Sequence, residues 1–139
     1  MNCFANARKK RDVVKYVLDA SAVLALLQRE PGHQQVEKML VEAGISAVNL
    51  CEVASKLAAK GLEETLVRPE LLALGLEVIP CDEAVAFRAA LIHAAARPTG
   101  LSLGDSVCLA SAAIAGAVAV TTDRAWSRLK GAPRVQQIR

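Results

Sequence analysis

The stretch that decides the fold spans residues 13–22 and reads VVKYVLDASA. It begins with a β-branched apolar run, which is typical of a buried strand, and the run ends at Asp19. Apolar residues at helical spacing follow from Val23, so the sequence predicts a strand over 13–18 and then a short helix over 21–28. Ligands of open α/β sheets bind beyond the carboxyl ends of the strands, and we therefore expect Asp19 to face the functional edge.

Helical and extended patterns alternate along the rest of the chain. We predict further helices over residues 34–42, 48–60, 68–74, 82–96, 102–115 and 123–129. We predict further strands over residues 45–46, 77–79, 118–121 and 134–138, the last at an edge of the sheet. Gly44, Gly61 and Gly116 are interpreted as helix ends. Strands that alternate with helices indicate an α/β fold with a mostly parallel sheet.

Length and composition limit the function classes. The 139 residues fit one domain, which we place at residues 13–139, and 53% hydrophobic residues predict an ordered core. Only 3% are aromatic, so the chain offers no platform for stacking bases. The net charge of +3 is compatible with a polyanionic partner but does not require one. Residues 1–12 are predicted to be a flexible basic lead-in whose cations either face solvent or contact phosphate.

The four cysteines are interpreted as free thiols of a cytoplasmic protein. They lack the C-x-x-C spacing of zinc sites and no apolar secretion signal precedes them. We expect most of Cys3, Cys51, Cys81 and Cys108 to be buried as small apolar groups. The most apolar segment, 107–120, is shorter than the roughly 20 residues that span a bilayer, so no membrane association is expected.

Four acidic residues can be interpreted either as ordinary helix residues or as parts of one metal site. Asp19, Asp105 and Asp123 each suit a helix cap, and Glu52 suits a solvated helix face. Taken together, they follow strands or begin helices that a parallel sheet brings to one edge. Carboxylates that converge repel one another unless a cation lies between them. An all-oxygen site favours Mg²⁺ or Mn²⁺, and such ions support hydrolysis of a phosphodiester.

Four motifs in order resemble those of PIN-domain nucleases. They are YVLDASA at 16–22, NLCEV at 49–53, LSLGDS at 101–106 and TTDRAW at 121–126. The resemblance covers nearly the whole chain from Val13 onward, although the basic lead-in departs from the usual start. It implies a three-layer sandwich with helices on both faces of the sheet. The small size and the S-L-G-D form resemble the VapC toxins of VapBC toxin–antitoxin pairs.

The resemblance also implies roles for individual residues. Asp19 and Asp105 would be the principal metal ligands, and Glu52 and Asp123 would complete the acidic site directly or through water. Ser21, Asn49 and Thr121 would be hydrogen-bond partners around the metal. The implied activity is a Mg²⁺-dependent (or Mn²⁺-dependent) endoribonuclease. The implied partners are RNA, a VapB-type antitoxin that presents an arginine to the carboxylates, and a second copy in a homodimer.

Two other functions stay open at this point. A PIN-like fold without catalysis would bind RNA or a partner only. A phosphoryl-transfer enzyme is disfavoured, because Ser21 stands where a D-x-D motif needs its second aspartate. Trp126 is predicted to be a packing anchor. Arginines that suit an RNA path are Arg88, Arg97, Arg124 and Arg128.

Overall fold

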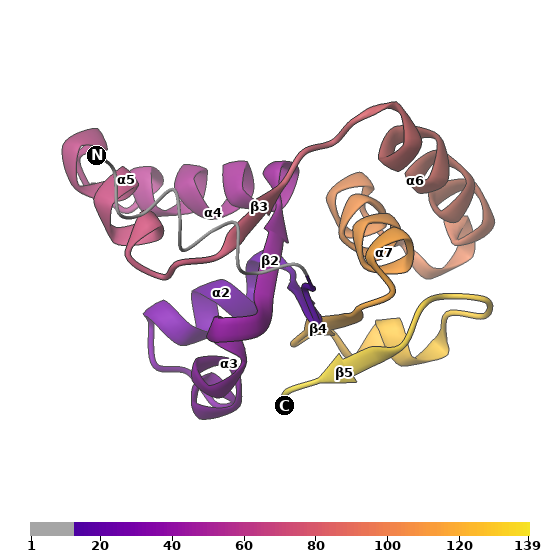
Figure 1. Ribbon diagram of the computed structural model, residues 1–139, viewed down its shortest axis with the longest axis horizontal. Helices are drawn as coiled ribbons and strands as arrows, with labels where there is room; N and C mark the ends of the chain where they lie inside the picture. The colour runs from indigo at the N-terminus through magenta and orange to yellow at the C-terminus, as the bar shows by residue number, and fades with distance from the viewer. Residues whose placement is uncertain (1–12) are drawn as a thin grey trace.

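Five parallel strands form one sheet in the computed structural model, which describes residues 13–139 (Figure 1). Their order across the sheet is β3-β2-β1-β4-β5, so β5 is an edge strand, as predicted. The strands are β1 (Tyr16–Leu18), β2 (Ala43–Ser46), β3 (Glu77–Ile79), β4 (Val118–Thr121) and β5 (Val135–Gln137). All four neighbouring pairs are parallel, which confirms the predicted α/β architecture.

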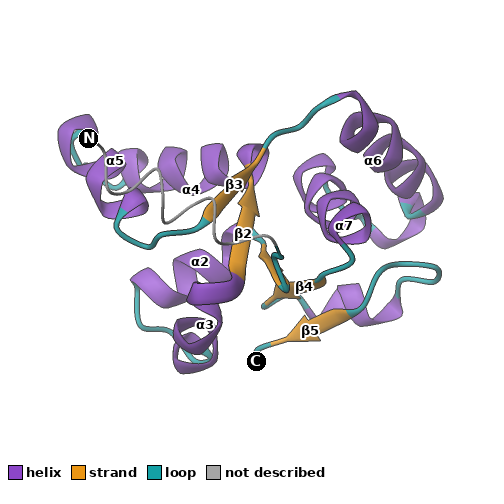
Figure 2. Cartoon of the chain, in the orientation of Figure 1, coloured by secondary structure: helices purple, strands orange, loops and turns teal. Residues whose placement is uncertain are grey.

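Helices lie on both sides of this sheet (Figures 1 and 2). The α-helices are α2 (Ala20–Leu27), α3 (His33–Met39), α4 (Ala47–Ala59), α5 (Glu64–Leu72), α6 (Glu83–Ala95) and α7 (Leu103–Ala115). Short 3-10 helices are η1 (Leu40–Glu42), η2 (Arg97–Thr99) and η3 (Arg124–Arg128). Helices α2 to α5 gather on one side and the hairpin of α6 and α7 on the other, which confirms the three-layer sandwich.

Alternation along the strands divides the core between these two sides. Leu18 and Val120 belong to the apolar cluster with α2, α3 and α4. Val17 and Ala119, one position earlier in each strand, belong to the cluster with α7. Successive side chains of a strand point to opposite faces, so each strand supports both layers. Trp126 joins the α7 cluster and is 1% exposed, which confirms its prediction as a packing anchor.

The register of the three central strands brings their ends together. Leu18 pairs with Ile45 on one neighbour and with Val120 on the other. The next residues along these strands are Ser46, Asp19 and Thr121, and all three are buried. The carboxyl edge of the sheet therefore presents a row of polar side chains at its centre.

Several predicted element bounds are wrong. The first strand begins at Tyr16 rather than at residue 13. Gly44 is a residue of β2 and ends no helix. Its backbone lies so close to β3 that an added Cβ would be 3.0 Å from the Glu77 carbonyl oxygen, which explains the glycine at this position. The helix predicted over 34–42 is split into α3 and η1.

Helix α5 begins earlier than predicted, at Glu64 rather than at residue 68. The carbonyl of Glu63 accepts from the backbone N–H groups of Leu66 and Val67, which closes the first turn before Pro69 is reached. Pro69 therefore lies inside the helix.

The cysteine prediction is also wrong in part. Cys108 is buried, but Cys51 and Cys81 are exposed. Cys3 and the lead-in of residues 1–12 lie outside the described residues. In the described part of the chain, no helix has both the length and the apolar character to cross a membrane.

Candidate active site

Asp19 lies at the centre of the sheet edge formed by the carboxyl ends of the strands, and both of its carboxylate oxygens accept hydrogen bonds. It caps the N-terminus of α2, where its Oδ1 accepts from the Ala22 N–H at 2.8 Å. The same oxygen accepts from the Ser21 hydroxyl at 2.7 Å. Its Oδ2 accepts from the Thr121 hydroxyl at the end of β4, at 2.6 Å. Three donors from two elements therefore fix the orientation of this carboxylate.

Burial gives Asp19 an unusual acidity. The residue is 3% exposed, and loss of solvent raises its pKa from 3.8 to about 6. The hydrogen bonds from Thr121, Ser21 and Ala22 oppose this rise, and the nearby charge of Asp105 adds to it. Because no cation among residues 13–139 contributes to the balance, the negative charge of Asp19 is kept at a free-energy cost.

Ser21 and Thr121 link Asp19 to the segment that carries Asp123. The Ser21 hydroxyl accepts from the Thr122 N–H at 3.0 Å, and the Thr121 hydroxyl accepts from the Asp123 N–H at 3.0 Å. Asp123 is exposed and caps η3 by accepting from the Ala125 N–H at 2.9 Å. The two predicted hydrogen-bond partners thus join the ends of β1 and β4.

Asn49 makes the corresponding link between α4 and α7. Its side chain is fully buried; its Oδ1 accepts from the Ser46 hydroxyl at 2.6 Å. Its Nδ2 donates to the Gly104 carbonyl in the first turn of α7, at 3.3 Å. The first turns of α4 and α7 are therefore held against each other, and Glu52 and Asp105 stand on these two helices.

Glu52 lies directly against the backbone of α7. A Cβ added at Gly104 would clash with the Glu52 Oε1, so glycine leaves room for this carboxylate in its present orientation. Burial first and the charge of Asp105 second raise the pKa of Glu52, whereas Lys56 one turn later lowers it. Asp105 accepts from the Ser102 N–H through Oδ2 at 3.2 Å and completes a capping box.

Three of the four predicted carboxylates are therefore brought into electrostatic contact, and the fourth is tethered to them. The charges of Asp19, Asp105 and Glu52 all reach the buried thiol of Cys108, whose pKa is raised first by burial and then by these charges. Within residues 13–139, no three His, Cys, Asp or Glu side chains lie close enough to form a ready-made metal site. The N-termini of α2, α4 and α7 meet at this edge, and their partial positive charge favours anions.

The acidic residues can both stabilise helix N-termini and form a candidate site. Asp19 and Asp123 cap helices and Asp105 is the acidic partner of Ser102 in a capping box, as their sequence positions predict. Sequence reasoning missed Ser46 and Gly104, which position Asn49 and Glu52. Ser46 had a local signal, since a serine three residues before Asn49 suits a helix cap. Gly104 had no local sequence signal, because the carboxylate that it accommodates, that of Glu52, is 52 residues away in the sequence.

Several solved structures with the same fold are of VapBC or toxin–antitoxin complexes. A toxin–antitoxin complex from Klebsiella pneumoniae matches with a TM-score of 0.69 at 17% identity, over 90% of this chain and 98% of that chain. VapBC2 from Rickettsia felis, bound to a promoter DNA fragment, matches with a TM-score of 0.68 at 18% identity, over 88% and 97%. DNA-bound VapBC from Salmonella typhimurium matches with a TM-score of 0.65 at 22% identity, over 91% and 100%.

Sequence comparison gives a result at the level of the family. No curated protein matches this chain. The model of the PIN domain, however, matches residues 16–132, a range that contains all four carboxylates and each of their hydrogen-bond partners described above. The chain belongs to the PIN-domain family.

Proposed function

We propose that this protein is a metal-dependent endoribonuclease of the VapC toxin type. The observation that carries the proposal is the buried carboxylate of Asp19, which three donors fix in place while no cation of the described residues offsets its charge. Asp105 and Glu52 add charge to the same edge. Such a cluster favours a bound cation, because an opposite charge lowers the cost of keeping buried carboxylates ionised.

Mg²⁺ or Mn²⁺ fits the donors that this edge offers. All candidate ligands are oxygens, and Mg²⁺ in proteins is usually held by one or two carboxylates together with waters and substrate phosphates. Asp19 and Asp105 would hold the ion, and Glu52 and Asp123 would contact it directly or through its waters. The bound ion would supply charge stabilisation at the phosphoryl oxygen and a more acidic water.

The protein's own residues have distinct roles in this proposal. Ser21 and Thr121 keep Asp19 in one orientation by donating to its two oxygens. Asn49 keeps α4 and α7 in register and so sets the separation of Glu52 and Asp105. The three helix N-termini favour a phosphate at this edge.

A VapB-type antitoxin is the proposed partner in the cell. The structural matches include VapBC complexes, and this similarity supports an antitoxin partner that covers the acidic edge with an arginine. An apolar groove of about 870 Å³ between α5 and α4, lined by Leu50, Val67 and Leu71 among others, suits an apolar antitoxin segment. A homodimer in the cytoplasm completes the proposal.

Cleavage of a mixed RNA panel tests the proposed activity. Protein freed of co-purifying partners is assayed with Mg²⁺, with Mn²⁺ and with EDTA, beside the variants Asp105→Asn and Asp82→Asn. Asp82 is the matched control, since it also caps a helix, by accepting from the Val85 N–H, but lies outside the acidic edge. We expect metal-dependent cutting that Asp105→Asn reduces at least a hundredfold and that Asp82→Asn leaves unchanged.

A non-catalytic binding module is the second candidate function. The observation that favours it is the lack, within residues 13–139, of three metal-ligating side chains at coordinating distance. If the folded protein binds RNA or an antitoxin but cuts no RNA with either metal, the binding module replaces the nuclease. Cutting that persists in EDTA, or in Asp105→Asn at full rate, contradicts the metal-dependent mechanism.

A further inference from the structure

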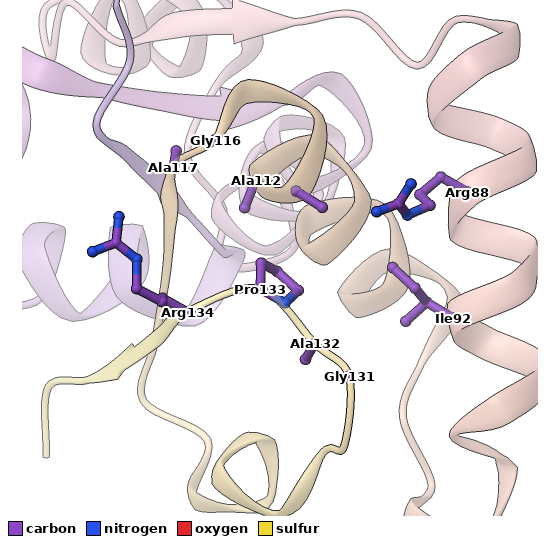
Figure 3. Close-up of a pocket in the computed structure, with 10 residues that line it drawn as sticks. Arg88, Ile92, Ala112, Gly116, Ala117, Gly131, Ala132, Pro133 and Arg134 are labelled. Atoms are coloured by element: carbon purple, nitrogen blue, oxygen red, sulfur yellow. The ribbon is translucent and has the colours of Figure 1, made fainter.

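A cationic groove lies along α6, and none of the four carboxylates of the acidic edge lines it. It consists of two adjoining hollows of about 580 and 350 Å³, which share Arg88, Ile92, Gly131 and Ala132 in their walls. Helix α6 lines one side of the groove and residues 128–134 another, and the end of α7 at residues 112–117 also lines the smaller hollow. Figure 3 shows Arg88 extending from α6 toward α7, with Pro133 and Arg134 on the opposite side of the hollow.

The charged residues that line this groove, among residues 13–139, are all cations. They are Arg88, Arg128, Lys130 and Arg134, and no Asp or Glu of this range lines either hollow. Two ion pairs are present within residues 13–139, and neither lies in the groove: Lys15 binds Glu42 at 2.8 Å and Arg139 binds Glu30 at 2.7 Å. No ion pair joins the four groove cations to another residue of the range 13–139, so their donors are available to a ligand.

The chemistry of the groove suits a phosphate backbone. The guanidinium of arginine presents a planar set of N–H donors that matches phosphate oxygens. Four like charges along one groove would favour a ligand with repeated negative charge over a single anion. Between the cations lie Leu91, Ile92 and Pro98, so the groove has no aromatic platform on which bases would stack.

Helix η3 connects the acidic edge to one end of the groove. Helix η3 is capped by Asp123 at its first end and finishes with Arg128, which lines the groove. A five-residue 3-10 helix is roughly 10 Å long, from a rise of about 2.0 Å per residue. A nucleic-acid strand that lies across the acidic edge would therefore reach the groove within a few nucleotides.

We propose that the cationic groove binds the phosphate backbone of an RNA strand that also reaches the acidic edge. The identity of the strand as RNA rests on the proposed function. Arg88 and Arg128 were both predicted for an RNA path, and Lys130 and Arg134 extend that path toward β5. The groove contributes affinity that does not depend on base sequence, since its contacts are to phosphates.

Binding of a labelled single-stranded RNA 12-mer, measured in EDTA over a range of KCl concentrations, tests the proposal without any need for cleavage. The variant is Lys130→Gln/Arg134→Gln. The control is Lys38→Gln/Arg68→Gln, which removes the same charges from exposed positions on α3 and α5. We expect the groove variant to bind roughly tenfold more weakly at 0.1 M salt, and its salt slope to fall by about 1.4, or 0.7 for each lost phosphate contact.

Each outcome decides the proposal separately from the nuclease. Equal affinity of the groove variant and wild type, or an equal loss in both double variants, overturns the groove. A labelled oligo-glutamate that binds as tightly as the RNA, with the same dependence on Lys130 and Arg134, would assign the groove to an acidic protein segment instead. If RNA is cut but binding ignores the groove, only the groove fails. If binding depends on the groove and nothing is cut, only the nuclease fails.

Discussion

The acidic edge and the cationic groove both gather like charges, but they differ in burial. Asp19 at the acidic edge is 3% exposed, and loss of solvent is the largest cause of its raised pKa. Arg88, Arg128, Lys130 and Arg134 in the groove are all exposed. Water screens the groove cations from one another, whereas the carboxylate of Asp19 depends on the protein for its stabilisation.

This difference separates two ways of preparing a surface for a charged ligand. At the acidic edge, the unfavourable free energy of a buried charge is already present, so a cation that binds there relieves it. In the groove the free protein carries little strain, and binding gains mainly from released counterions. Changes to the first region should therefore alter stability as well as activity, and changes to the second should alter binding alone.

The substitution Asp19→Asn should have the largest effect on stability. The folded protein binds the Asp19 proton more tightly than the unfolded chain does, because the pKa is about 6 instead of 3.8. The stability from this group is complete below pH 3.8 and is lost as the pH rises through about 6. Asparagine does not ionise, so in EDTA the stability of the variant relative to wild type should rise by roughly 2–3 kcal/mol between pH 4 and pH 7.5.

Urea denaturation at the two pH values measures this difference. Asp82→Asn is the control for replacement of a capping carboxylate at an exposed position. Addition of Mg²⁺ or Mn²⁺ should stabilise wild type at pH 7.5 and leave Asp19→Asn unchanged, since only a ligand of the folded state shifts unfolding. A wild type that gains stability over Asp19→Asn as the pH rises contradicts our assignment of buried charge.

The substitution Gly104→Ala should have an intermediate effect and separate stability from activity. In a helix this change usually stabilises by up to about 1 kcal/mol. Here the new Cβ would clash with the Glu52 Oε1, so the flexible end of Glu52 must leave its present position against α7. We expect RNA cleavage to fall roughly tenfold to a hundredfold, or about 1.4–2.7 kcal/mol of activation free energy, with little loss of folding stability.

A double-mutant cycle with Glu52→Ala isolates the contact. In the Glu52→Ala background, Gly104→Ala should regain its ordinary stabilising effect, because the clashing carboxylate is gone. Equal effects of Gly104→Ala on stability in both backgrounds would show that Glu52 does not lie against α7.

The sequence predicts the acidic edge well because each part of the signal is local. Asp19 follows an apolar run, and Asp105 stands in a capping box. Parallel pairing then brings Asp19 beside Thr121, because Leu18 and Val120 are in register. Asp123 was predicted to join the same site, but its exposed carboxylate caps η3, and its link to Asp19 runs through the Thr121 hydroxyl.

Features that depend on distant parts of the chain escaped prediction. Gly44 looks like a helix end until the carbonyl of Glu77 is placed beside it by strand pairing. The bridge from Asn49 to the Gly104 carbonyl spans 55 residues. The groove likewise joins Arg88 to residues 128–134, and two of the four arginines predicted for the RNA path, Arg97 and Arg124, do not line it.

The smallest effect on stability is expected in the groove, and this makes Arg134→Gln a useful contrast with Asp19→Asn. Arg134 is exposed and has no ion-pair partner within residues 13–139, so its loss should change the free energy of unfolding by less than about 0.5 kcal/mol. Any change should be stabilising, because removal of one charge weakens the repulsion among the groove cations.

Arg139→Gln is the matched control, since it breaks the ion pair with Glu30 and should destabilise by up to about 1 kcal/mol. Thermal denaturation at low and at 0.5 M salt measures both variants. A destabilisation by Arg134→Gln larger than that of Arg139→Gln would mean that this cation supports the fold, whereas near-neutral stability combined with weaker RNA binding would mean that it is kept for its ligand.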